Sequence, residues 1–290
     1  MMKNYLEYIA FLIFAKTAQM LGIKKLHYPA KFLAFLFYDV LKLRKNVVMK
    51  NLQIAFPHKS KNEKKVIAQK SYYHFSRLIL EIMCFPKMSN DEISSLLLCD
   101  TVDELTQVFN EGNGLVFLTA HIGNWEVGAI SLPMQMGTIM YPIIKPQRNP
   151  FVTKWLNNMR ETHGNKVISL GMSIRQIYKV IKEGKLLGVV GDQRGPQDGM
   201  RVKLFGRDTA IFSGTGELVL KTKVPLYILF AIRIDDYHYK AFSEKIDLEN
   251  LSGEPVEQAR EIMQRYMNLL EKYVKLYPEQ WFWMHNIWKY

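Results

Sequence analysis

The chain has 290 residues, which is enough for one large domain or two small ones. Hydrophobic residues make up 48% of it, so a sizeable core can form, and the net charge of +12 favours anionic partners such as nucleic acid, an anionic membrane or a phosphorylated substrate. The two cysteines, Cys84 and Cys99, lack metal-ligand spacing, and nothing in the sequence suggests a disulfide framework, so we expect two reduced thiols in a cytoplasmic compartment.

The first fifty residues are both basic and apolar. They carry nine basic residues against two acidic ones, and they contain two apolar blocks, 9–15 and 32–38. The first block is too short to span a bilayer and lacks the cleavage site of a signal peptide. We expect the two blocks to form a helical pair that lies in a membrane interface. Two core helices of a soluble domain, or one transmembrane helix, are the alternatives.

Further helices are predicted up to residue 110. Residues 44–56 and 63–84 each form a helix that a proline ends, and residues 89–110 form two short helices with Ser89 and Thr101 as caps.

From residue 115 onward, short strands alternate with helices, which argues for an α/β core. The predicted strands are 115–119, 138–145, 166–168, 186–192, 224–234 and 237–243. The predicted helices are 125–135, 150–162, 172–183, 214–222 and 256–277.

The stretch 115–126 is the first candidate for chemistry. His121 follows a buried strand, and Asn124 is a good N-cap for the helix that carries Glu126. Gly123 permits a tight turn, so that the Glu126 carboxylate can reach the imidazole. A carboxylate bound to one ring nitrogen leaves the other nitrogen free as a base. The alternative is a buried core histidine and a glutamate that interacts only with the helix dipole.

The sequence His121-Ile122-Gly123-Asn124-Trp125-Glu126 resembles the signature of the bacterial lipid A late acyltransferases, also called lauroyl/myristoyl acyltransferases. This family is a branch of the glycerolipid-acyltransferase-like superfamily. The embedded Gly-Asn-Trp-Glu makes the match much more specific than a bare His-x4-Glu. Residues 44–57 also resemble the N-terminal pattern of the family, and Glu81 stands where the family usually has an acid.

The segment 191–194 ends another predicted strand, and its Asp-Gln pair resembles the second block of the family. Polar groups at the carboxyl end of a strand, beside another such end, lie where open α/β sheets place their sites. The alternative for Asp192 is a simple turn residue.

A third block, 202–214, resembles the family but departs from it at Leu204, Ile211 and Phe212, where phenylalanine and threonines are usual. Gly214 opens a helix and can still present backbone N–H groups to a phosphate or an oxyanion. The aromatic C-terminal segment 277–289 also resembles the closing motif of the family, and physically it predicts a cap on the core.

A cluster of basic residues surrounds the predicted strand ends, and guanidinium groups suit phosphates. Its members are Lys145, Arg148, Arg160, Arg194, Arg201, Lys203 and Arg207. Arg160 matches a family arginine that faces the substrate, whereas for any other single member a solvated surface charge is the simpler interpretation.

The resemblance runs from about residue 44 to residue 289. It implies an α/β fold with a mixed, mostly parallel central sheet flanked by helices, preceded by an N-terminal membrane-associated helical segment. We assign residues 1–56 to that segment and residues 57–290 to the α/β acyltransferase domain.

The resemblance implies transfer of a fatty acyl chain from an acyl carrier protein thioester to a hydroxyl of a lipid A precursor, at the cytoplasmic face of the inner membrane. His121 would be the general base, oriented by Glu126, with direct transfer and no metal or cofactor. The other substrate-binding candidates are Asn124, Arg160, Asp192, Gln193, Arg194 and Gly214. Expected partners are acyl carrier protein, the lipid A precursor and an anionic membrane surface.

The sequence leaves two alternatives open. One is an acyltransferase for another glycolipid or for a lysophospholipid. The other is a non-catalytic basic protein that binds membranes or nucleic acid. Nucleic acid is disfavoured, because the positive charge coincides with apolar blocks and not with a reading module.

Overall fold

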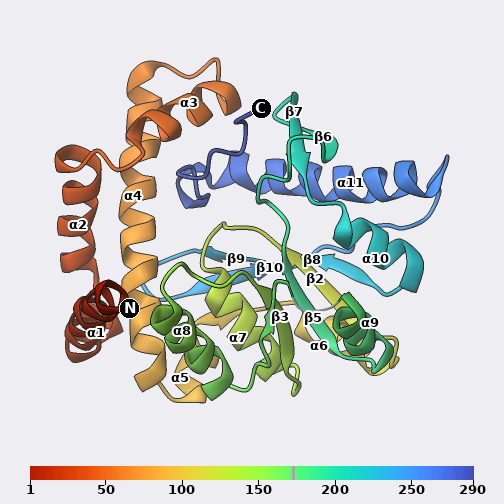
Figure 1. The fold of residues 1–290 in the computed structure, drawn as a ribbon, viewed down its shortest axis with the longest axis horizontal. Helices are drawn as coiled ribbons and strands as arrows, with labels where there is room; N and C mark the ends of the chain where they lie inside the picture. The colour runs from red at the N-terminus through yellow and green to blue at the C-terminus, as the bar shows by residue number, and fades with distance from the viewer. Residues whose placement is uncertain (172–173) are drawn as a thin grey trace.

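The computed structural model describes residues 1–171 and 174–290. Its centre is a sheet of five parallel strands in the order β4-β3-β5-β2-β8 (Figure 1). The strands are β2 (Leu115–Thr119), β3 (Met140–Ile144), β4 (Ile168–Ser169), β5 (Leu186–Val190) and β8 (Leu226–Ile228). The predicted α/β class, with a mostly parallel sheet flanked by helices, is confirmed.

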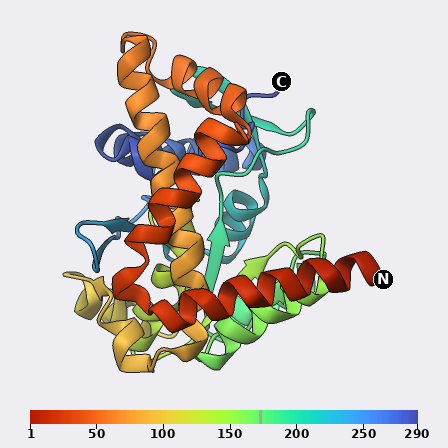
Figure 2. The ribbon, with the colours of Figure 1, turned by 90° about the vertical axis from the view of Figure 1, so that its left-hand side faces the viewer.

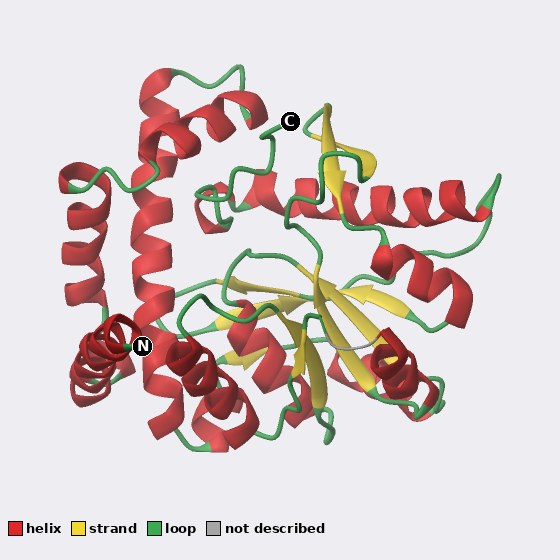
Figure 3. Cartoon of the chain, viewed as in Figure 1, coloured by secondary structure: helices red, strands yellow, loops and turns green. Residues whose placement is uncertain are grey.

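Helices cover both faces of this sheet (Figure 3). Alternate side chains of β2 point to opposite faces, as the twofold repeat of a strand requires. Leu115 and Phe117 pack into the core under α5, α6, α7 and α8, whereas Val116 and Leu118 pack into the core under α9, α10 and α11. The sheet is therefore buried on both sides, which is typical of parallel sheets.

The helices are α1 (Met2–Leu21), α2 (His27–Phe35), α3 (Lys45–Ala55), α4 (Lys61–Cys84), α5 (Asn90–Ser94), α6 (Val102–Asn110), α7 (Trp125–Gln135), α8 (Pro150–Thr162), α9 (Ile174–Lys182), α10 (Gly214–Thr222) and α11 (Pro255–Leu276). Ser89 and Thr101 are the N-cap residues of α5 and α6, as predicted; the Ser89 side chain accepts a hydrogen bond from its helix, whereas the Thr101 side chain accepts none from α6. Residues 172 and 173 of the predicted helix 172–183 lie outside the described residues.

A second sheet and a hairpin complete the fold. β10 (Tyr239–Phe242) lies between β1 (Leu97–Leu98) and β9 (Phe230–Arg233), and the hairpin consists of β6 (Met200–Leu204) and β7 (Arg207–Ile211). The predicted strand 224–234 is in fact two strands. β8 pairs with β2 in the main sheet, whereas β9 pairs with β10, so the chain passes from one sheet to the other at Leu229.

The N-terminal helices lie outside the α/β core. α2 packs along the long helix α4, and α1 packs against α4 and α8 (Figure 2). The rings of Phe11 and Trp155 meet edge to face with their centroids 5.0 Å apart, so α1 is attached to the core by aromatic contacts. Within residues 1–171 and 174–290, no helix combines the length and the apolar character that crossing a bilayer requires.

Candidate active site

His121 lies just beyond the end of β2, and Asp192 lies just beyond the end of the neighbouring strand β5. Thr119 of β2 is in register with Val190 of β5, so each side chain is two residues past a matched pair. The parallel register therefore brings them together, and His121 Nδ1 is 2.7 Å from Asp192 Oδ1.

Asp192 is buried, and its second oxygen is held independently of the imidazole. Oδ2 accepts hydrogen bonds from the His121 backbone N–H at 2.9 Å and from Trp281 Nε1 at 2.8 Å. The C-terminal segment reaches this point because residues Ile122 and Trp281 form a β-bridge. The carboxylate therefore has a fixed orientation before any substrate binds.

This geometry sets the chemical state of the imidazole. The Asp192 carboxylate accepts a hydrogen bond from the Nδ1–H group, so in the neutral ring Nε2 has a free lone pair, as a general base requires. Burial alone would lower the pKa of His121, but the charge and hydrogen bond of Asp192, together with the charge of Glu126, raise the pKa above its usual range. Burial also acts against the charged form of Asp192, and the contacts with His121 and Trp281 outweigh it and lower the pKa of Asp192.

The predicted hydrogen bond from the His121 ring to the Glu126 carboxylate is wrong. Glu126 is in the first turn of α7, and both of its oxygens bind Arg160 of α8, with Nε to Oε2 at 2.8 Å and Nη2 to Oε1 at 2.5 Å. The helix directs this carboxylate toward α8, and Asp192 takes the place that the sequence had suggested for Glu126. Glu126 still acts on the imidazole through its charge.

A cavity of about 950 Å³ lies against the imidazole. His121, Glu126, Arg160, Gln193 and the N-terminal residue of α10, Gly214, supply polar groups to its wall. Most of the remaining wall is apolar and comes from many elements, including Phe11, Ile82, Phe117, Met140, Leu156 and Leu218. A cavity of this size and character suits a long apolar chain with a polar end beside His121.

Three of the predicted substrate-binding residues, Asn124, Asp192 and Arg194, do not line the cavity. Asn124 is fully buried; its Oδ1 accepts a hydrogen bond from the N–H of Val127 and caps α7, as predicted, while its Nδ2 binds Glu81 and Tyr239. Arg194 faces the C-terminal segment, where its Nη1 donates to the carbonyl of Asn286 at 2.7 Å. Asn124 and Arg194 therefore both make structural contacts, and their role in substrate binding stays a prediction.

Sequence reasoning missed the residues that hold the turn from behind. His74 of α4 donates from Nε2 to the Gly123 carbonyl at 3.0 Å, and burial lowers the pKa of His74 to about 3, so this ring is neutral. The backbone N–H of Gly123 donates to the carbonyl of Gln280 at 3.0 Å. The aromatic C-terminal block gave a signal for core packing, but none for a contact with the Asp192 carboxylate.

The geometry defines a class of protein. The site combines a histidine base, a buried carboxylate partner and a large apolar cavity. Together these features fit an enzyme that activates a nucleophile beside a lipid-like substrate. Among the described residues, no group of three or more histidine, cysteine, aspartate or glutamate side chains is arranged to hold a metal ion.

Comparison with known proteins identifies the family. A family model described as bacterial lipid A biosynthesis acyltransferase matches residues 1–290, so the chain belongs to this family and is an acyltransferase. It is 24% identical to the lipid A biosynthesis lauroyltransferase of Escherichia coli K12, over 86% of this chain and 80% of the relative. It is 22% identical to the lipid A biosynthesis acyltransferase of Haemophilus influenzae, over 81% of this chain and 72% of the relative. A phosphatidylinositol mannoside acyltransferase of Mycolicibacterium smegmatis is 21% identical, over 74% of this chain and 69% of the relative.

Proposed function

We propose that the protein moves a fatty acyl chain from an acyl carrier protein thioester to a hydroxyl of a lipid A precursor. The observation that carries the proposal is the 2.7 Å contact between His121 Nδ1 and Asp192 Oδ1 at the wall of the apolar cavity. The names of the lauroyltransferase and acyltransferase relatives support the acceptor class.

In the proposed mechanism, His121 Nε2 takes the proton of the acceptor hydroxyl while Asp192 holds the ring by Nδ1. The acceptor oxygen attacks the thioester carbonyl and forms the new ester bond. The carbon–sulfur bond then breaks, and the imidazolium returns its proton to the leaving thiolate. The acyl group passes directly between the substrates, without a covalent acyl-enzyme.

The charge that develops in this reaction has candidate partners in the cavity wall. Gly214 begins α10, whose first backbone N–H groups and helix dipole favour an anion. Arg160 and Gln193 supply side-chain donors, and we assign them to the polar part of the substrates or to the oxyanion. Glu126 holds Arg160 in place through a bidentate ion pair that is largely buried.

We further propose that the N-terminal helices rest on the cytoplasmic face of the inner membrane. α1 and α2 expose large apolar side chains to solvent, namely Leu6, Ile9, Ile13, Met20, Tyr28, Phe32 and Phe35. Exposed lysines lie among them, at positions 16, 24, 25 and 31. Apolar side chains interspersed with lysines are typical of a surface that inserts into an anionic interface.

Vesicle binding tests the membrane proposal. We expect Phe32→Asp combined with Phe35→Asp to weaken binding to anionic phospholipid vesicles about tenfold or more, because each ring that leaves water contributes roughly 1.5–3 kcal/mol. Val256 is exposed to a similar degree on α11, so Val256→Asp is the matched control and should bind like the wild type. Equal binding by all three proteins contradicts the proposal.

The donor and the acceptor are tested together by mass spectrometry. Purified protein is incubated with acyl carrier protein or coenzyme A thioesters, and with a lipid A precursor or a mannosylated phosphoinositide as acceptor. We expect acyl transfer from the carrier-protein thioester to the lipid A precursor. Transfer only to the mannosylated lipid would replace the lipid A acceptor with the substrate named for the Mycolicibacterium relative.

A further inference from the structure

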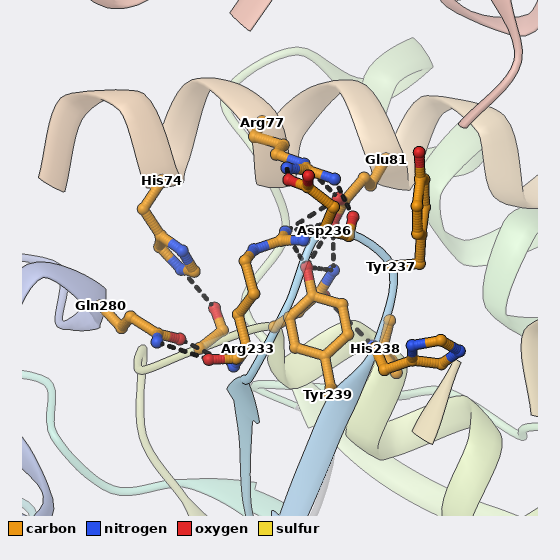
Figure 4. Close-up of polar contacts among 12 residues, drawn as sticks. His74, Arg77, Glu81, Arg233, Asp236, Tyr237, His238, Tyr239 and Gln280 are labelled. Carbon is orange, nitrogen blue, oxygen red and sulfur yellow. Dashed lines mark hydrogen bonds and ion pairs between the residues drawn. The ribbon is translucent and has the colours of Figure 1, made fainter. Parts of the chain in front are cut away.

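A buried polar cluster lies behind the catalytic turn, on the side away from the cavity. Its centre is Glu81 of α4, which is 2% exposed (Figure 4). Arg233 of β9 donates from Nη2 to both Glu81 oxygens at 2.8 and 2.7 Å, and Arg77 donates from Nε to Oε1 at 3.1 Å. The Tyr239 hydroxyl also donates to Glu81 Oε2.

The cluster is connected to the catalytic turn through Asn124. Nδ2 of this amide donates to Glu81 Oε2 and to the Tyr239 hydroxyl, both at 3.2 Å. Asn124 lies between His121 and Glu126 in the sequence and caps the helix that carries Glu126. The Glu81 carboxylate therefore binds a polar side chain of the turn that does not line the cavity.

The arrangement is costly, which argues for more than general packing. Burial alone would raise the pKa of Glu81, and the Arg233, Tyr239 and Arg77 contacts outweigh burial and lower that pKa. Arg233 Nε and Nη1 are buried without a hydrogen-bond partner. A buried ionic cluster of this kind often contributes less to stability than an apolar replacement of the same shape, so its benefit is expected in the fixed position of what it holds.

We propose that Glu81 is a positioning residue for acyl transfer, which acts through the Asn124 amide to fix the His121–Glu126 turn against the cavity. Four contacts then hold the turn in place. Glu81 binds Asn124, His74 binds the Gly123 carbonyl, and Ala231 of β9 accepts from the Asn124 N–H at 2.8 Å. The fourth contact is from the Gly123 N–H to the C-terminal segment.

The geometry offers a test by exchange of the two partners. Asn124→Asp places a second carboxylate against Glu81 and breaks the contact by repulsion. Glu81→Gln leaves two amides and removes the charge that faces Arg77 and Arg233. The double variant restores one carboxylate and one amide, keeps a hydrogen bond between them, and retains an oxygen that caps α7.

The measurement is kcat and KM per folded enzyme in the acyl-transfer assay. We expect each single variant to lower kcat by about 10- to 100-fold with KM nearly unchanged, because displacement of a catalytic group by about 1 Å costs up to about 100-fold. We expect the double variant to recover most of this loss. Ser131→Ala, which removes a buried hydrogen bond to Ile93 elsewhere on α7, is the control for lost stability and should keep its kcat.

Wild-type kcat in both single variants, a double variant no better than the worse single, or an equal loss in Ser131→Ala would overturn the proposal. If a single variant does not fold, Asn124→Ser carries the test, since serine keeps the cap and loses the links to Glu81 and Tyr239. That variant should also lose kcat, and wild-type kcat would refute the role. The inference rests on the proposed function, whose own failure is distinct: the wild type would then not acylate the lipid A precursor, or His121→Ala would remain active in the same assay.

Discussion

The substitution Asp192→Asn distinguishes the role of Asp192 from that of Glu126, the other carboxylate near His121. Asp192 Oδ2 accepts two hydrogen bonds, from the His121 N–H and from Trp281 Nε1, whereas Oδ1 accepts only from His121 Nδ1. An asparagine must therefore place its carbonyl oxygen at the Oδ2 position and its NH2 group against Nδ1. Nδ1 then becomes an acceptor, the proton moves to Nε2, and the base is lost.

The expected loss in kcat is roughly 10²–10⁴-fold, which is the contribution of a well-placed general base. Removal of the negative charge also lowers the pKa of His121, since Asp192 is the main cause of its elevation. A lower pKa would move the acid limb of the kcat/KM profile to lower pH, but the activity would remain low at every pH, because the remaining neutral imidazole has the wrong tautomer.

The assay follows acyl transfer by mass spectrometry across the pH range, with Glu126→Gln as the matched variant. Glu126→Gln keeps the Asp192 contact and loses only the Arg160 ion pair and some charge near the ring, so a smaller loss is expected. In the wild type, activity should fall as the pH drops through the raised pKa of His121. Near-normal activity in Asp192→Asn with inactive Glu126→Gln would refute this reasoning.

The turn, a sheet glycine and a buried histidine each give a further test. Gly123→Ala should not fold to an active form, because its Cβ would lie 1.8 Å from the Ala231 oxygen; activity and thermal unfolding check this. Gly188→Ala should disfavour long acyl donors in competition assays, because its Cβ would lie 2.6 Å from Met140 Sδ and push that side chain into the cavity. His74 is neutral in the folded state with a pKa lowered to about 3, so unfolded chains bind more protons and stability should fall below the usual histidine pKa of about 6.5. Urea unfolding at several pH values should show a smaller fall in His74→Gln. Activity in Gly123→Ala would contradict the first prediction, and an unchanged donor preference in Gly188→Ala would contradict the second. The third would be contradicted by a pH dependence of stability in His74→Gln equal to that of the wild type.

The strand-end location of the site could be predicted from the sequence. The sequence of residues 115–119 and 186–190 predicts buried strands, each followed by a polar group. Parallel strands place their carboxyl ends on one edge of the sheet. The choice of partner could not be predicted. It depends on the register that pairs Thr119 with Val190, which the whole sheet determines, and on the direction in which α7 carries Glu126.

The contacts among the residues behind the turn could not be predicted for a different reason, although the sequence had singled out Glu81 and Asn124 individually. Glu81, Asn124, Arg233 and Tyr239 lie on four different elements and meet only after α4 packs across β9 and β10. Trp281 is similar, since its hydrogen bond to Asp192 spans 89 residues of sequence. Contacts of this kind leave no local spacing signal.

The most direct measurement is the mass of a lipid A precursor after incubation with acyl-loaded carrier protein and either wild-type protein or His121→Ala. We expect a gain of one acyl chain with the wild type and no gain with a His121→Ala variant that unfolds at the wild-type temperature. The same gain with both proteins would contradict this expectation.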